Sequence, residues 1–227
     1  MVTKRLAKFL SLINVYYLIP VFENFICLEG IDGSGKSTQI AALETLFKGK
    51  GLEVLRVREP GGTEISEAVR QILLNSAYKD RMSCITELLL YNAARSQLIH
   101  EVIKPALERG AAVLADRFAY STLAYQGYGR CLDISVIKTL QQISCGECFP
   151  SKTFILDIPV SISRKRQLGD GNRNGQDRIE QENDDFFERV MEGYRAIAHE
   201  NPQSCFLIDA SASADNIFNL IKSHLNG

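Results

Sequence analysis

The sequence predicts a three-layer α/β fold in which helices cover both faces of a five-stranded parallel sheet. Two observations lead to this prediction: short apolar runs alternate with helical patterns along the chain, and a glycine-rich turn joins the first run to the first helix. With 227 residues and a 45% hydrophobic composition, the chain can form one domain around a single substantial core.

The predicted strands are the short apolar runs, and the predicted helices are the longer segments between them with apolar residues at helical spacing. In chain order, the strands lie at 25–28, 53–57, 111–115, 153–157 and 205–209, and the helices at 37–47, 63–76, 84–109, 133–144, 160–168, 183–200 and 213–225. Gly49 and Gly51 end the first helix, because glycine commonly follows a helix C-terminus. The polar stretches at 59–63 and 169–176 return at once to a helical pattern, so neither is expected to be a domain linker.

The composition narrows the class of protein. The 26 Lys and Arg residues almost balance the 27 Asp and Glu residues, which argues against a surface built to bind nucleic acid. Six cysteines are too few for a disulfide scaffold, so we expect a reducing, cytoplasmic location. Cys145 and Cys148 form a CxxC pair that could be half a zinc site or a redox pair, but no second pair and no nearby histidine completes it.

The N-terminal segment resembles a secretory signal in having basic residues before an apolar run at 9–22. No small-residue cleavage site follows the run, which at about 14 residues is too short to span a bilayer. We therefore expect residues 1–23 to be a non-catalytic extension without membrane attachment, and the functional domain to span 24–227.

Residues 30–37 match the phosphate-binding pattern GxxxxGK[ST], and they lie between a predicted buried strand and a predicted helix. Glycines let the backbone wrap around an anion, which the N–H groups and the positive helix end then face. In this pattern Lys36 contacts the β- and γ-phosphates and Ser37 binds Mg²⁺, whereas the alternative is an ordinary glycine-rich turn. The residues expected to bind ATP are Gly30, Asp32, Gly33, Ser34, Gly35, Lys36, Ser37 and Thr38.

Asp116 ends the third predicted strand, at the sheet edge where open α/β folds bind their ligands. We expect this carboxylate to hold Mg²⁺, directly or through water. The alternative role for an aspartate in this position is to cap the next turn.

Other patterns separate the classes of phosphate-loop protein. The sequence contains neither the NKxD element of GTPases nor the HRD segment of protein kinases. Arginines are frequent at the predicted turns, as a site where two phosphorylated substrates meet would require. Two alternatives stay open: a kinase for another nucleoside monophosphate or an unphosphorylated deoxynucleoside, and a nucleotide-binding regulator with slow hydrolysis.

Five further motifs resemble, in order and spacing, those of bacterial thymidylate kinases. They are Arg58-Glu-Pro-Gly-Gly-Thr63, Tyr91-Asn-Ala-Ala-Arg95, Asp116-Arg117, Ser121-Thr-Leu-Ala-Tyr-Gln-Gly127 and Asp177-Arg-Ile-Glu-Gln181. The resemblance runs from about residue 25 to the end of the chain. It implies a P-loop nucleoside monophosphate kinase that phosphorylates dTMP to dTDP with ATP and Mg²⁺ in dTTP biosynthesis, and a homodimer packed through helices that include 84–109.

The resemblance also implies roles for the residues that would bind dTMP. Tyr91 takes the place of an aromatic residue, commonly Phe, that stacks on thymine, and Arg95 that of an arginine at the base edge. Arg70 and Arg117 would hold the acceptor phosphate, because a guanidinium group matches its oxygens. The remaining positions with implied dTMP contacts are Asp32 near the 3′-hydroxyl, Tyr125 against the sugar, Thr122 and Gln126 at the base, and Pro60.

The basic segment at about 164–178 resembles the lid of this family. One family subtype places an arginine in the phosphate loop, but Gly33 occupies that position here. A lid arginine must then approach the transferring phosphoryl group. The candidates, which the sequence does not rank, are Arg166, Arg173 and Arg178, and they join Lys36 and Arg117 as the expected catalytic residues.

Overall fold

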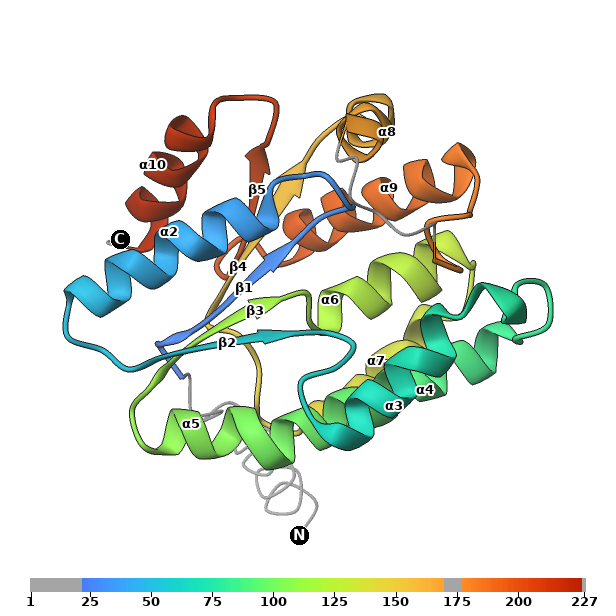
Figure 1. The fold of residues 1–227 in the computed structure, drawn as a ribbon, viewed down its shortest axis with the longest axis horizontal. Coiled ribbons are helices and arrows are strands. Elements are labelled where there is room, and N and C mark those ends of the chain that lie inside the picture. The colour runs from blue at the N-terminus through green and yellow to red at the C-terminus, as the bar shows by residue number, and fades with distance from the viewer. Residues whose placement is uncertain (1–21, 170–176, 226–227) are drawn as a thin grey trace, which may run out of the picture.

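The computed structural model describes residues 22–169 and 177–225. Within these residues, five strands form one parallel sheet in the order β2-β3-β1-β4-β5, which confirms the predicted α/β fold (Figure 1). The strands are β1 (Phe25–Glu29), β2 (Val54–Arg58), β3 (Ala112–Asp116), β4 (Lys152–Asp157) and β5 (Cys205–Asp209). Each of them overlaps a predicted range.

Strand β1 lies at the centre of the sheet, and its sequence explains why. All five of its residues are at most 1% exposed, as expected for a parallel strand covered on both faces. In the register of the sheet, Asp116 of β3 aligns with Leu28 of β1 and with Arg58 of β2. The carboxyl ends of these three strands therefore meet at one edge.

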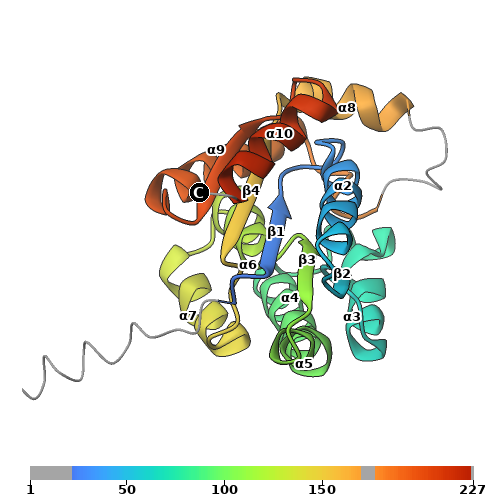
Figure 2. The same cartoon turned by 90° about the vertical axis from the view of Figure 1, so that its left-hand side faces the viewer.

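Helices cover both faces of the sheet (Figures 1 and 2). Ile26 and Leu28 of β1 pack in one apolar cluster with α2, whereas Phe25 and Cys27 pack in a second cluster with the segment from η3 to α5. The helices are α2 (Lys36–Gly49), α3 (Glu64–Leu74), α4 (Cys84–Leu98), α5 (Lys104–Glu108), α6 (Ala119–Thr122), α7 (Ile134–Cys145), α8 (Val160–Gly169), α9 (Asp184–Glu200) and α10 (Ala214–Leu225), with a 3₁₀ turn η2 (Ser76–Tyr78) and π-helical segments η3 (Ile99–Ile103) and η4 (Leu123–Gly129).

Several helices begin where the sequence supplies a capping side chain. The side chains of Thr63, Ser83 and Asn183 each accept a hydrogen bond from the backbone N–H three residues further on, at the starts of α3, α4 and α9. Such caps satisfy backbone donors that have no partner within the helix.

The segment predicted as one helix over 84–109 is a continuous helix as far as Glu108, but its hydrogen-bonding pattern changes from α-helical to π-helical and back. Helix α4 passes into the wider turn η3 before α5 begins. Pro105, in the first turn of α5, has no N–H to donate and its ring crowds the preceding turn. A π-helical turn at this point accommodates the proline within a continuous helix.

The helical segment formed by α6 and η4 was not predicted from the sequence. Residues 122–127 within it are all buried, so the segment has no polar face and no amphipathic period. Helix α9 packs against η4, which places the segment in the interior of the molecule.

Among the described residues, no helix is long and apolar enough to cross a membrane. All six cysteines are free. Burial raises the pKa of Cys145 to about 11 and that of Cys148 to about 12. No cluster of three or more metal-binding side chains occurs in the described part of the chain.

Candidate active site

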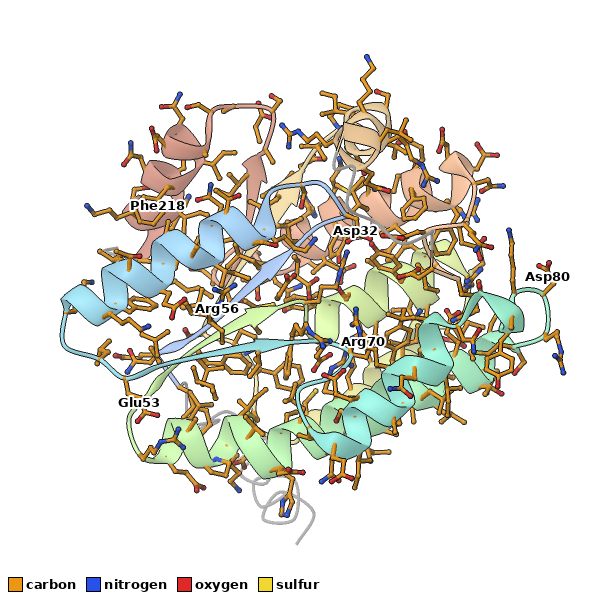
Figure 3. All side chains as sticks on the ribbon, in the orientation of Figure 1. Asp32, Glu53, Arg56, Arg70, Asp80 and Phe218 are labelled. Atoms are coloured by element: carbon orange, nitrogen blue, oxygen red, sulfur yellow. The ribbon has the colours of Figure 1, made fainter. Side chains whose placement is uncertain are left out.

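A cleft of about 790 Å³ opens at the carboxyl edge of the sheet, the place where open α/β folds bind ligands. Figure 3 shows Asp32 and Arg70 at this edge and Glu53 toward the opposite end of the sheet. The sequence-predicted site residues that line the cleft are Asp32, Gly33, Ser34, Gly35, Lys36, Ser37, Thr38, Pro60, Arg70, Tyr91, Arg95, Asp116, Arg117, Thr122, Tyr125, Gln126 and Arg166. Gly30 and Arg178 do not line it, and Arg173 lies outside the described residues.

The loop between β1 and α2 curls around the ammonium group of Lys36. This group donates hydrogen bonds to the carbonyl oxygens of Gly30 and Ile31, both at 3.1 Å. Gly30 has φ 132°, and a Cβ atom there would lie 2.7 Å from the carbonyl oxygen of Leu156. Burial, and secondarily the charge of Arg117, lowers the pKa of Lys36. The sequence therefore forms a tight loop around a cation that it keeps out of solvent.

Arg117 connects the phosphate loop to the opposite wall of the cleft. Its Nη1 atom donates to the carbonyl oxygen of Gly30 at 2.8 Å, and its Nη2 atom donates to Oδ1 of Asp32 at 2.9 Å. Its guanidinium carbon lies 5.1 Å from the centroid of the Tyr125 ring, a distance at which cation–π attraction acts. Its backbone has φ 68°, in the left-handed region.

Glu29, the last residue of β1, holds the backbone around Arg117, and sequence reasoning missed this role. Its Oε1 atom accepts from the backbone N–H groups of Phe118 and Ser121 at 2.9 and 3.0 Å. Its Oε2 atom accepts from the hydroxyls of Ser121 and Tyr194 at 2.5 and 2.9 Å. Burial raises the pKa of Glu29. The feature of the sequence that could have indicated this role is a single charged residue at the end of an apolar strand.

Arg95 is 1% exposed and is held by three groups distant in the sequence. Its guanidinium approaches a carboxylate oxygen of Glu59 to 2.6 Å, and its Nη2 atom donates to the Thr122 hydroxyl at 2.8 Å and the Phe118 carbonyl at 3.1 Å. Burial raises the pKa of Glu59 to about 7, against the opposing charge of Arg95. The Nη1 atom of Arg95 is buried and has no hydrogen-bond partner among the described residues, so its N–H groups remain for a ligand.

Arg70 and Arg58 converge on one acceptor at the rim of the cleft. Both donate to the carbonyl oxygen of Pro60, at 2.8 and 3.1 Å respectively. Arg58 also donates to both carboxylate oxygens of Glu67, at 3.0 and 3.1 Å. The charge of Arg58 is thus paired with Glu67, whereas no carboxylate is bonded to Arg70 in the described residues.

Tyr91 and Gln126 also line the cleft. Tyr91 lies one turn before Arg95 on α4, so both side chains occupy the same helix face. The Nε2 atom of Gln126 donates to Oε1 of Glu87 at 2.8 Å.

Asp116 and Ser37 provide the oxygen atoms expected to hold a divalent cation. The Oδ1 atom of Asp116 is buried and accepts no hydrogen bond from the described residues. Ser37 lies in the first turn of α2, and its side chain is exposed to the same cleft. An unpartnered carboxylate oxygen and a hydroxyl fit Mg²⁺, which prefers oxygen ligands and keeps several waters.

Helix α8 brings Arg166 to the tip of the phosphate loop. Arg166 donates to the carbonyl oxygens of Gly33 and Ala210 at 3.1 and 3.2 Å. The hydroxyl of Ser163 donates to the carbonyl oxygen of Asp32 at 2.6 Å. A Cβ atom on Gly33 would lie 3.1 Å from the carbonyl oxygen of Ser163, so α8 packs closely on this glycine.

The structure corrects the prediction that Arg178 could reach the transferring phosphoryl group. Arg178 is 4% exposed and forms an ion pair with Glu87 at 2.6 Å. Its Nε atom donates to the carbonyl oxygen of Leu73 at 2.7 Å. Because this side chain is enclosed between α3 and α4, it fixes the segment after residue 176 to these helices.

Comparison with known proteins gives consistent matches over most of the chain. The family model described as thymidylate kinase matches residues 28–221. The thymidylate kinase of Kosmotoga olearia is 45% identical over 193 residues, 85% of this chain and 90% of the relative, and that of Halothermothrix orenii is 44% identical over 203 residues, 89% and 96% of the two chains. The crystal structure of thymidylate kinase from Ehrlichia chaffeensis superimposes with a TM-score of 0.72 at 32% identity and covers 88% of this chain and 97% of that one.

Proposed function

The chain belongs to the thymidylate kinase family, whose members phosphorylate dTMP to dTDP with ATP and Mg²⁺, and we propose that the single cleft at the sheet edge holds both nucleotides for this reaction. The observation that supports this most strongly is the concentration of cations there. Within residues 22–169 and 177–225, five arginines line the cleft besides Lys36: Arg58, Arg70, Arg95, Arg117 and Arg166. In a chain with a net charge of only −1, such a concentration suits two phosphate groups that meet end to end.

The donor ATP occupies the phosphate loop in this proposal. Its β- and γ-phosphates take the place of the Gly30 and Ile31 carbonyls as partners of Lys36. The adenine lies beside the turn after β5, where Ala210, Ala212 and other small side chains line the cleft. Ser37 and Asp116 would hold Mg²⁺, which would supply positive charge to neutralise the phosphates of the donor.

The acceptor phosphate lies between Arg70 and Arg117. It is already an anion near neutral pH, because the second pKa of a phosphate monoester is about 6, so no general base is needed. Asp32 is an unsuitable base in any case, since its carboxylate accepts a hydrogen bond from Arg117 and lies 3.9 Å from Lys36. Lys36 and Arg166 stabilise charge on the transferring group, and Arg117 aligns the attacking oxygen.

The polarity of the base pocket supports thymine as the base. Arg95 offers an unpartnered N–H donor at Nη1. Gln126 uses its NH₂ group on Glu87, which leaves its amide oxygen as an acceptor on the cleft side. One donor beside one acceptor complements O4 and N3–H of thymine, and Tyr91 supplies a ring on which the base stacks.

Replacement of Tyr91 by alanine tests the base pocket. We expect the KM for dTMP to rise about tenfold or more, because the stacking surface is lost, whereas the KM for ATP changes less than twofold. Steady-state kinetics with each substrate varied in turn measures both constants. Tyr78, which lies outside the cleft, offers a matched control in Tyr78→Ala, with both constants unchanged. An equal rise in both constants for Tyr91→Ala would show that Tyr91 does not stack on the base of dTMP.

The acceptor specificity tests the proposed function as a whole. ADP release is measured with dTMP, dUMP, dCMP, AMP, an unphosphorylated deoxynucleoside, or no acceptor. We expect release to depend on the acceptor and to be fastest with dTMP. Release without an acceptor would instead favour a hydrolytic regulator, and a faster reaction with another acceptor would assign a different nucleoside kinase.

The assembly and the setting of the enzyme are also part of the proposal. The neighbouring helices α3 and α4 expose Ile65, Ile72, Ile85 and Leu89, each at least 44% exposed, and an apolar face of this kind supports a homodimer. The free cysteines support a reducing cytoplasm. We further infer that residues 24–227 form the catalytic domain, since the family match begins at residue 28, and that residues 1–23 are an extension outside it.

A further inference from the structure

Glu87 on α4 is a buried carboxylate that does not line the cleft and meets the base pocket only through Gln126. It is 1% exposed and lies one turn before Tyr91. Its Oε1 atom accepts from Nε2 of Gln126 at 2.8 Å and from Nε of Arg130 at 3.2 Å. Its Oε2 atom accepts from Nη2 of Arg130 at 3.2 Å and lies 2.6 Å from Nη1 of Arg178. Every donor around it is therefore a side chain brought from elsewhere in the chain.

The protonation state of the Glu87 carboxylate decides which end of the Gln126 amide faces the cleft. An amide presents either an oxygen or an NH₂ group, whereas an ionised carboxylate only accepts hydrogen bonds. Burial works against ionisation of Glu87, but hydrogen bonds and charge from Arg130, with Gln126 and Arg178, outweigh it and lower its pKa. The Gln126 amide must therefore turn its NH₂ group toward Glu87 and its oxygen toward the cleft.

We propose that Glu87 is a positioning residue that sets base specificity, because it fixes Gln126 as a hydrogen-bond acceptor toward the pyrimidine. The inference rests on the proposed function. Thymine and uracil present a donor at N3, which matches the Gln126 oxygen. Cytosine presents an acceptor at N3, so the two lone pairs would face each other and the base would be rejected.

The surrounding ion pairs keep this arrangement rigid. Arg130 also donates to Glu182 at 2.7 Å. Arg178 also donates to the carbonyl oxygen of Leu73 at 2.7 Å. Each arginine is thus anchored on its far side, which prevents it from turning away and leaving the carboxylate free to protonate.

The variant Glu87→Gln tests the inference, because a glutamine has one acceptor oxygen in place of two. Arg130 and Arg178 both approach the Oε2 position, so we expect the new amide oxygen to lie there and the new NH₂ group to face Gln126. Gln126 then turns its oxygen inward and its NH₂ group toward the base. The ratio of kcat/KM for dTMP to that for dCMP should fall about tenfold or more. The ratio for dTMP to dUMP should stay within twofold, because both bases present the same edge.

Glu182→Gln is the matched control. It removes one carboxylate from the same network, on the outer side of Arg130, and leaves the acceptor of Gln126 in place. We expect its dTMP to dCMP ratio to equal that of the wild-type enzyme. If Glu87→Gln does not fold, the double variant Glu87→Met with Arg178→Met removes one acid and one base together and leaves Arg130 paired with Glu182. It also frees the Gln126 amide to present either its oxygen or its NH₂ group to the base, so the ratio should fall, but by less than in Glu87→Gln.

The possible outcomes separate this inference from the proposed function. A parallel loss of kcat/KM with dTMP, dUMP and dCMP, or an unchanged dTMP to dCMP ratio in the Glu87 variants, would overturn the positioning role and leave the kinase assignment intact. A wild-type enzyme without preference for dTMP over dCMP would overturn both. A fall in the dTMP to dCMP ratio confined to the Glu87 variants supports the inference.

Discussion

Replacement of Lys36 by methionine is expected to lower kcat at least a hundredfold with both substrates saturating. Methionine keeps most of the length of the side chain but removes the charge that faces the β- and γ-phosphates in the proposed site. Loss of one such preorganised contact in a transition state typically costs two to three orders of magnitude in rate. An ADP-release assay measures kcat, and binding of ATP measured by calorimetry should weaken far less than kcat falls.

The fold should tolerate this substitution. The substitution loses two hydrogen bonds to backbone carbonyls, which lowers stability, but it also removes a buried charge, which raises stability. The free energy of unfolding should therefore change by only about 1 kcal/mol. Lys48→Met is the matched control, since Lys48 lies on the same helix and pairs with Glu44 at the surface. Near-normal turnover in Lys36→Met would show that the phosphate loop does not take part in the reaction as proposed.

Much of the fold could be predicted from the sequence, because every described strand except β2 contains an uninterrupted apolar run. Strand β1 has no exposed residue and so gives an unambiguous pattern. The segment over α6 and η4 could not be predicted, because its residues are buried on almost every side and its glycines argue against a helix. Its helical form depends on packing against α9, which is not a local property of the sequence.

The candidate site likewise contains residues that could be predicted from the sequence and residues that could not. Lys36, Arg95 and Arg117 could be proposed from the sequence because the motifs that contain them are contiguous. The carboxylates that orient them were missed: Glu59 lies 36 residues before its partner Arg95, and Glu29 lies 89 residues before the Phe118 amide that it accepts from. Such partners come together only when the strands meet at one sheet edge.

These carboxylates share one physical role. Glu29, Glu59 and Glu87 are each at most 6% exposed. Each accepts a hydrogen bond from one residue that lines the cleft, namely Ser121, Arg95 and Gln126 respectively. A buried carboxylate leaves its neighbours little freedom, because a donor that turned away would leave a charge unsatisfied. The cations and amides of the cleft are therefore held in place before a substrate arrives.

The second large effect is expected for Arg117→Ala, which should lower kcat/KM for dTMP at least a hundredfold. Arg117 belongs to both halves of the cleft, because it contacts Gly30 and Asp32 while its backbone is fixed through Glu29. Its removal leaves the acceptor phosphate with Arg70 alone and loosens the phosphate loop. Both binding and alignment of the attacking oxygen should suffer.

Two further variants show whether this loss comes from the side chain. Arg117 itself lies at φ 68°, a conformation that costs any residue with a Cβ atom about 1 kcal/mol. Arg117→Ala therefore adds no backbone strain, and Arg117→Gly, which relieves it, should lose activity to the same extent. Arg109→Ala removes an arginine paired with Glu53 at the surface and should leave the kinetics unchanged. Near-normal kcat/KM for dTMP in either Arg117→Ala or Arg117→Gly would show that the Arg117 side chain does not hold the acceptor phosphate.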